Sequence, residues 1–172
     1  PLSHHLGVLG PSTGVTAWIG VRCVAKPEPG DIFVVSAAAG AVGSIAGQIA
    51  KRDGAHVIGI AGGPTKVEYL TSELGFDAAI DYKNDDVTAR LRELAPDGVN
   101  VFFDNVGGEI LDHALAALNR YGRVVSCGRI AEYLKAPEDL YRLRNWHRIG
   151  AQRATMRGFF IYDLAEDFPR AE

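Results

Sequence analysis

The sequence has little cysteine, no long apolar run and no marked excess of charge of either sign. Its 172 residues include two cysteines and carry a formal net charge of −3. Cys23 and Cys127 stand far apart and in no metal-ligand spacing, which indicates two reduced thiols. The negative charge argues against a nucleic-acid surface. No apolar run reaches the roughly 18 residues of a membrane span, and the first residues lack a signal-peptide pattern. We expect a cytoplasmic protein without nucleic-acid or membrane partners.

The five histidines add no metal signature. His4 and His5 adjoin each other, and His56, His113 and His147 are scattered along the chain. None stands at a spacing from cysteine or a carboxylate that is typical of a zinc site. We therefore expect no metal in this segment.

What the sequence does contain is a regular alternation of strand and helix patterns from residue 30 onward. Short apolar runs predict strands over residues 32–35, 57–60, 78–81, 99–103, 123–126 and 158–161, the last approached from about Thr155. Helical patterns cover residues 42–52, 65–74, 85–94 and 109–118, with Thr65 as an N-cap. This alternation predicts an α/β fold, a Rossmann doubly wound parallel six-stranded sheet with helices on both faces.

Three segments fall outside the alternation. Residues 14–25 form a helical run before the first strand, and residues 130–150 form a long insertion that we interpret as a loop followed by a short helix. Residues 163–168 have the pattern of a helix that has just begun. The two ends of the sequence therefore predict that the chain is a domain of a longer protein.

The turn after the first strand carries the first functional signal. Residues 38–43, A-A-G-A-V-G, follow the dinucleotide fingerprint G-x-G-x-x-G with alanine first. Gly40 lets the backbone approach a pyrophosphate, and Gly43 lets the helix pack closely on the strand. The helix start, which includes Ala41 and Val42, offers free N–H groups to phosphate. A tight turn without a ligand is the alternative, and the flanking strands and helix favour dinucleotide binding.

The end of the second strand indicates which dinucleotide binds. NAD sites usually place Asp or Glu there to hold the ribose 2′-hydroxyl. This chain instead has Gly62 and Gly63, followed by Lys66 at a helix start. The glycines leave room for a 2′-phosphate and Lys66 supplies positive charge, so we expect NADP(H). The alternative is that Lys66 is a solvated surface lysine.

Polar and small residues end the fourth and fifth strands. Asn105 follows the fourth strand, where the carboxyl ends of parallel strands face a ligand crevice, and it could contact a nicotinamide ribose or only cap a turn. Cys127 and Gly128 end the fifth strand. Gly128 would let a nicotinamide ring approach, and Cys127 is interpreted as a pocket wall because no base adjoins it in sequence.

Several of these motifs resemble one known family. The runs at residues 10–20, 37–51, 73–83, 103–108 (F-D-N-V-G-G) and 127–133 are similar to the cofactor domain of the medium-chain dehydrogenase/reductase superfamily. Within it they resemble the zinc-free prostaglandin reductase, alkenal reductase and curcumin reductase branch. That resemblance implies NADPH-dependent reduction of a carbon–carbon double bond next to a carbonyl, with hydride transfer to the β-carbon and a proton to the α-carbon.

The resemblance also implies roles for individual residues. Lys66 and Tyr82 would hold the 2′-phosphate, and Asn105 and Cys127 would lie along the nicotinamide half. Tyr133 matches the tyrosine of the family motif I-S-x-Y-N, which reaches the nicotinamide ribose and the substrate. The strand that lines the nicotinamide pocket with backbone groups matches Phe159, Phe160 and Ile161. The chain departs from that motif at Ala131 and Leu134, where the family has serine and asparagine.

The resemblance further implies domains that lie outside this sequence. Residues 1–29 would connect to an N-terminal substrate domain, and residues 30–172 would form the NADP-binding Rossmann domain without its C-terminal return segment. We expect the isolated segment to have weak activity or none, and the protein to form a homodimer through the sixth strand. Two alternatives remain at this stage, a quinone reductase of the same superfamily and a non-catalytic NADP(H)-binding sensor or scaffold.

Overall fold

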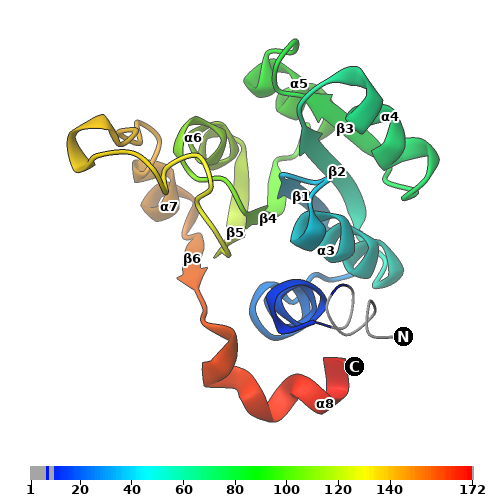
Figure 1. The fold of residues 1–172 in the computed structure, drawn as a ribbon. Helices are drawn as coiled ribbons and strands as arrows, with labels where there is room; N and C mark the ends of the chain where they lie inside the picture. The colour runs from blue at the N-terminus through cyan, green and yellow to red at the C-terminus, as the bar shows by residue number, and fades with distance from the viewer. Residues whose placement is uncertain (1–6, 8–9, 172) are drawn as a thin grey trace.

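The computed structural model, which describes residue 7 and residues 10–171, is built around one six-stranded parallel sheet (Figure 1). The strand order is β3-β2-β1-β4-β5-β6. The strands are β1 (Ile32–Ser36), β2 (His56–Ala61), β3 (Ala78–Asp81), β4 (Val99–Asp104), β5 (Leu118–Ser126) and β6 (Thr155–Gly158). The predicted doubly wound parallel sheet is confirmed.

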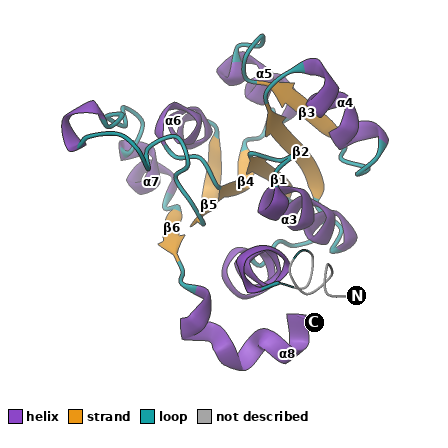
Figure 2. Ribbon diagram, in the orientation of Figure 1, coloured by secondary structure: helices purple, strands orange, loops and turns teal. Residues whose placement is uncertain are grey.

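Helices cover both faces of this sheet (Figure 2). One face carries α3 (Ala41–Arg52), α4 (Pro64–Ser72) and a continuous helix formed by η1 (Pro11–Val15), α2 (Thr16–Ile19) and η2 (Gly20–Ala25). The other face carries α5 (Val87–Leu94), α6 (Gly108–Ala116) and α7 (His147–Gln152). The remaining helical segments are η3 (Pro137–Asp139), η4 (Ile161–Asp167) and α8 (Phe168–Ala171).

The central strands bury both of their faces, which explains their uninterrupted apolar sequences. Successive side chains of a strand point to opposite sides. Phe33 and Phe103 therefore enter the core beneath α3, whereas Val34 and Phe102 enter the core beneath α5 and α6. All four are fully buried. Burial of such side chains contributes roughly 1.5–3 kcal/mol each, so these two cores fix the positions of the strand ends.

The direction of winding reverses between β1 and β4. Val34 pairs with Ile58 of β2 on one side and with Phe102 of β4 on the other. Strands β2 and β3 thus lie on one side of β1, and strands β4, β5 and β6 follow in order on its other side. In such sheets ligands bind at the carboxyl ends of the strands, at this switch point.

Several predicted boundaries differ from the structure, and three of these errors have a clear physical reason. Strand β5 begins at Leu118, before the expected start at residue 123, because Leu118 already pairs with Val99 ahead of a register shift. The N-cap of α4 is Gly63, and Thr65 lies inside the helix. Pro64 is the first helical residue, a position where its missing N–H costs nothing.

The third error concerns the sixth strand. It was expected over residues 158–161, but β6 covers Thr155–Gly158 and Ile161 begins η4. The apolar run Phe159 to Ile161 suggested a strand, yet these residues leave the sheet to pack elsewhere. The segment that follows, η4 and α8, lies against α2 and η1 (Figure 1), with the Arg170 guanidinium 5.4 Å from the centre of the Trp18 ring.

No helix within residue 7 and residues 10–171 is both long enough and apolar enough to cross a membrane.

Candidate functional site

A cavity of about 900 Å³ opens at the carboxyl ends of β1, β2 and β4. Four predicted cofactor residues line it: Gly40, Gly62, Lys66 and Tyr82. Its other walls come from the loop after β3, the start of α6 and the loop that begins at residue 127. Ligand pockets usually have volumes of about 300–1,000 Å³, so this cavity has room for a large ligand such as a dinucleotide.

The turn between β1 and α3 forms one rim of the cavity. Gly40 caps α3, and its N–H donates to the carbonyl of Ala37 at 2.8 Å. Gly43 packs so closely that a Cβ there would overlap that carbonyl and lie 3.0 Å from the Cα of Ala38. The expectation that Gly43 permits close packing of helix and strand is therefore confirmed. The left-handed residue of the turn is Ala37, with a φ of 47°, which sequence reasoning did not identify.

The α3 N-terminus follows this turn. Ala41 is its first helical residue and Val42 its second. Their N–H groups belong to the first turn of the helix, where donors have no partner inside the helix. No acidic side chain stands in this first turn, so its positive dipole end is available to an anion.

The end of β2 forms the second rim, and a buried aspartate holds it. The Asp81 carboxylate accepts hydrogen bonds from the N–H of Gly63 at 2.7 Å, from the N–H of Lys83 at 3.1 Å and from Asn84 Nδ2 at 2.6 Å. These bonds, that from Gly63 first, lower the pKa of Asp81. The Asp81 carboxylate is therefore engaged by hydrogen bonds within the turn, whereas the Lys66 and Lys83 side chains line the cavity.

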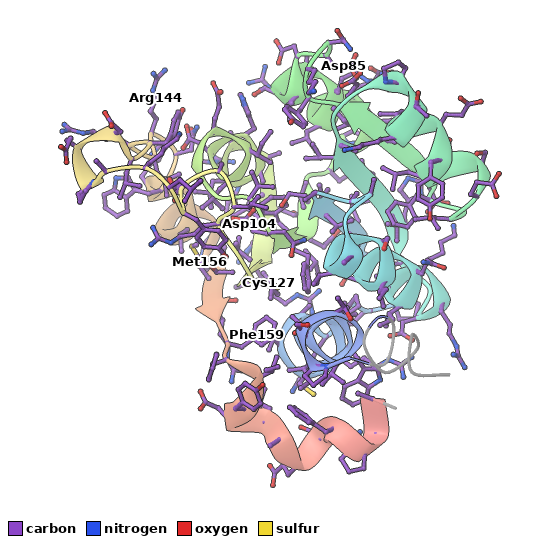
Figure 3. All side chains as sticks on the ribbon, in the orientation of Figure 1. Asp85, Asp104, Cys127, Arg144, Met156 and Phe159 are labelled. Atoms are coloured by element: carbon purple, nitrogen blue, oxygen red, sulfur yellow. The ribbon has the colours of Figure 1, made fainter. Side chains whose placement is uncertain are left out.

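The two strands that diverge at the switch point are fastened together by a buried cluster. Ser36 Oγ donates to Asp104 Oδ1 at 2.9 Å and accepts the N–H of Asn105 at 2.8 Å. Asp104 is 1% exposed and also accepts the N–H groups of Val106 and Gly107. Burial raises the pKa of the Asp104 carboxyl against the effect of these bonds. Figure 3 labels Asp104 near the centre of the molecule.

Asn105 has a structural contact that sequence reasoning missed. Its side-chain Nδ2 donates to the carbonyl of Ser36 at 2.8 Å, so the amide bridges the ends of β1 and β4. Asn105 is not among the residues that line the cavity. A role toward a nicotinamide ribose stays a prediction.

Cys127 and Gly128 continue from β5 beside this cluster. Cys127 packs against the core beneath α3, and burial together with the Asp104 charge raises the pKa of its thiol to about 12. A Cβ on Gly128 would lie 3.1 Å from Tyr133 Oη and 3.3 Å from the Asn105 carbonyl oxygen. Tyr133 is 60% exposed, and its Oη accepts the N–H of Arg129 at 3.2 Å. Cys127, Gly128 and Tyr133 border the ends of β4 and β5 but do not line the cavity.

The aromatic residues after β6 also lie apart from the cavity. Phe159 turns toward the N-terminal helix (Figure 3), where a Cβ on Gly20 would lie 3.0 Å from its ring. Phe160 is 62% exposed and stacks edge-on with Tyr162 at 5.3 Å between ring centres. The structure does not bring Phe159, Phe160 or Ile161 to the residues that line the cavity.

The structure adds cavity residues that the sequence motifs did not reveal. They come from the loop after β3, from α6 and from the insertion, and include Lys83, Asp85, Glu109, His113 and Tyr141. The His113 ring nitrogen Nδ1 and Thr88 Oγ1 lie 2.7 Å apart, which joins α6 to α5. The D-Y-K run was the one available signal for Lys83. Asp85 follows Lys83 in the same loop. Glu109 and His113 on α6 and Tyr141 in the insertion reach the cavity only through the packing of segments distant in sequence.

The first part of the insertion lies against the end of β4 and the start of α6. A Cβ on Gly107 would lie 3.2 Å from Glu132 Oε2, and the side chain of Glu132 is 14% exposed. The N–H groups of Ile130 and Ala131 donate to the carbonyls of Asn105 and Val106. The loop therefore follows the end of β4 and forms one wall of the cavity.

Among the residues that the structure describes, no three His, Cys, Asp or Glu side chains are grouped so that they could hold a metal ion. His4 and His5 lie outside the described residues.

The sheet order and the cavity at its switch point define a Rossmann-type dinucleotide domain. The chain belongs to the zinc-binding dehydrogenase family, whose model matches residues 41–172, and this match places it among the cofactor domains of the medium-chain dehydrogenase/reductase superfamily. The superfamily resemblance inferred from the motifs is confirmed.

The chain is similar to enzymes and structures of known kind. It is 41% identical to the 2-alkenal reductase (NADP(+)-dependent) of Nicotiana tabacum and 37% identical to the (+)-pulegone reductase of Mentha piperita. Each match covers 99% of the chain and 49% of the relative. The structure of CurA from Vibrio vulnificus in complex with NADPH superposes with a TM-score of 0.89 at 38% identity, over 98% of this chain and 51% of that one. The chain thus spans about half the length of these relatives.

Proposed function

We propose that the protein reduces the carbon–carbon double bond of α,β-unsaturated ketones or aldehydes with NADPH, and that this chain supplies the cofactor-binding half of the site. The observation that carries the proposal is the cavity at the switch point, whose β2 rim has two lysines, Lys66 and Lys83, beside an Asp81 carboxylate that accepts the Gly63 N–H. Asp85 and Asp86 also line the cavity, and each accepts a backbone N–H. The named activities of the similar reductases from tobacco and peppermint support the same reaction class.

The residues of the cavity fit the chemistry of NADPH. The closely packed Gly43 turn and the α3 N-terminus suit a pyrophosphate, which needs a backbone without side chains and unpaired N–H donors. Gly40, Ala41, Val42 and Gly43 are proposed to hold it.

The β2 rim suits a 2′-phosphate. Lys66 and Tyr82 are proposed to hold this phosphate, with Gly62 and Gly63 leaving room for it, and we add Lys83 because its side chain lines the same cavity. Ion pairs and charge-assisted hydrogen bonds from lysine would favour the phosphate over the hydroxyl of NADH. Asp81 would otherwise repel the phosphate, but its carboxylate is directed into the Gly63 turn.

The second half of the cofactor is proposed to lie over the ends of β4 and β5. Asn105, Cys127 and Gly128 border that region, and Gly128 presents no side chain toward it. Phe159, Phe160 and Ile161 stay proposed as residues of the nicotinamide side. When bound, NADPH supplies a hydride that adds to the β-carbon of the double bond while a proton reaches the α-carbon.

The chain's own contribution to that step is to position the reacting groups. The buried Ser36–Asp104 cluster fixes the strand ends, and orientation of this kind lowers the barrier to reaction. Tyr133 is proposed as the catalytic residue contributed by this chain. The residue is 60% exposed in a loop, and its hydroxyl can donate a hydrogen bond to an oxygen that gains charge.

The intact protein tests this proposal directly. We expect consumption of NADPH with a 2-alkenal or an open-chain enone and no consumption with a quinone. Tyr133→Phe is expected to lower kcat without a matching change in the Kd for NADPH. Consumption with the quinone alone would identify a quinone reductase instead. Tight NADPH binding without turnover on either acceptor would identify a cofactor sensor or scaffold and overturn the proposed reaction.

The protein is also proposed to form a homodimer through β6. All four residues of this edge strand are exposed, and no strand of the described part of the chain pairs with its outer side. An uncovered edge strand can pair with a second copy.

A further inference from the structure

A second cavity, which we call the arginine hollow, lies at the opposite end of the sheet from the first cavity, near the amino ends of the strands. It has a volume of about 290 Å³ and is enclosed by the loop before β4, the residues where α6 passes into β5, and α7. The first cavity opens at the carboxyl ends of the strands, whereas this hollow opens where β4 and β5 begin. The two cavities share no lining residue.

Three arginines from three different elements line the arginine hollow. Arg92 comes from the last turn of α5, Arg120 from β5 and Arg148 from α7. One carboxylate, that of Asp97, accompanies them. Within the described residues none of the three guanidinium groups forms an ion pair within 4.0 Å, although Arg22, Arg90, Arg123, Arg129 and Arg170 each do. The hollow therefore concentrates positive charge that the described chain does not neutralise.

Arg148 carries a buried donor without an acceptor. Its Nε is enclosed and has no hydrogen-bond partner among the described residues. Buried polar groups are almost always hydrogen-bonded, and an unpaired one that belongs to a charged group is especially costly. Arg148 is therefore an arginine beside the hollow for which the described chain supplies no acceptor at Nε.

Arg120 is held in place by its neighbour. Its guanidinium lies 5.0 Å from the centre of the Tyr121 ring, and its Nη2 donates to Tyr121 Oη at 3.2 Å. Stacking of this kind restrains the side chain and leaves other N–H donors of the guanidinium for a ligand.

We propose that the arginine hollow binds the phosphate or carboxylate group of a small anionic molecule through Arg92, Arg120 and Arg148. Planar guanidinium groups recognise both kinds of oxyanion through paired hydrogen bonds. The volume lies at the lower limit of ordinary ligand pockets, about 300 Å³, so it suits a small anion and not a second dinucleotide. This site is independent of the proposed reductase activity.

Calorimetric titration of the intact protein tests the site, with inorganic pyrophosphate and citrate as probes at fixed ionic strength. The Lys66→Ala variant weakens anion binding in the cofactor cavity and so isolates the hollow. In that background we expect Arg148→Gln to raise the Kd for the preferred probe roughly tenfold or more, the loss typical of one charge-assisted hydrogen bond. Tighter binding of pyrophosphate would assign a phosphate ligand, and tighter binding of citrate a carboxylate.

Arg52→Gln is the matched control, because Arg52 is exposed at the end of α3 and lines neither cavity. Circular dichroism checks that each variant is folded. Should Arg148→Gln fail to fold, Arg92→Gln replaces it, since Arg92 is exposed. The proposal is overturned if neither probe binds at millimolar concentration, if the Kd is the same in the arginine variants, or if Lys66→Ala alone abolishes binding.

Discussion

The carboxylate of Asp81 accepts a hydrogen bond from the N–H of Gly63 at 2.7 Å, which joins the end of β3 to the turn that follows β2. Asp81 thereby places a negative charge near the proposed phosphate site and at the same time directs it into the backbone. This one contact shapes the β2 rim, where Lys66 and Lys83 line the cavity together with Asp85 and Asp86.

Asp81→Asn is expected to loosen this rim and raise the KM for NADPH severalfold, because an amide is a weaker acceptor for the N–H groups of Gly63 and Lys83.

The lowered pKa of Asp81 also makes the stability of the folded state depend on pH. Its ionised form stabilises the folded state above the ordinary aspartate pKa of about 3.9, and that contribution is lost as pH falls through the lower folded value.

Urea unfolding of the wild-type protein and of Asp81→Asn, from pH 7 down to pH 3, measures this pH dependence of the free energy of unfolding. The stability difference between wild type and Asp81→Asn should be constant near neutral pH and shrink in acid. A difference that grows in acid would contradict the role assigned to the carboxylate.

Lys66→Ala is expected to raise the KM for NADPH by roughly ten- to a hundredfold, the range of a lost charge-assisted hydrogen bond. The KM for NADH should stay within about twofold, since NADH has no 2′-phosphate for the lysine to contact. Steady-state kinetics with both cofactors decides the matter. Equal losses for NADPH and NADH would show that Lys66 supports the fold and does not recognise the phosphate.

Gly43→Ala is expected to destabilise the domain by about 1–3 kcal/mol, the usual cost of overpacking, because a Cβ there would overlap the Ala37 carbonyl. NADPH binding should weaken with it. Gly150→Ala in α7 is the matched control, since its Cβ meets nothing within 4 Å. That variant should gain roughly 0.5–1 kcal/mol from helix propensity. Thermal unfolding measures both, and equal changes in the two variants would refute the packing role of Gly43.

Cys127 is expected to resist alkylation. With a thiol pKa of about 12, its thiolate fraction at pH 8 is on the order of a thousandfold below that of an ordinary cysteine with a pKa of 8.5. The rate with iodoacetamide, measured in a Cys23→Ser background, should be correspondingly slow and rise steeply up to pH 11. A rate near that of a free thiol at pH 8 would show that Cys127 is not buried in this way.

Met156→Lys is expected to convert the proposed dimer to a monomer. Met156 lies in β6 and is 41% exposed, so the lysine would place two charges against each other across a paired edge. Sedimentation velocity of the intact protein measures the change. Leu134→Lys, in a fully exposed loop position, serves as the control and should leave the dimer intact. A wild-type protein that sediments as a monomer would contradict the proposed dimer.

Sequence patterns predicted the sheet well because the central strands are buried on both faces and read as apolar runs between glycine turns. The same logic failed at Phe159 and Phe160, where an apolar run leaves the sheet. Phe159 packs beside the N-terminal helix, and Phe160 is 62% exposed. The site could be predicted where a short motif builds it, as at Gly40 and Lys66. His113 could not be predicted, because it lies on α6 and lines the cavity only through the packing of that helix beside α5, where it meets Thr88.

The hydrogen bonds from Ser36 to Asp104 and from Asn105 to Ser36 have a mechanical consequence. Strands β1 and β4 cannot shear or spread at their carboxyl ends without exposing a buried carboxylate, so the floor of the cavity is already assembled before any ligand arrives. The site is therefore preorganised at the strand ends, and ordering of the strands costs little of the ligand's binding free energy. Slow conformational steps of the reaction should accordingly reside in the loop at residues 129–135 and not in the sheet.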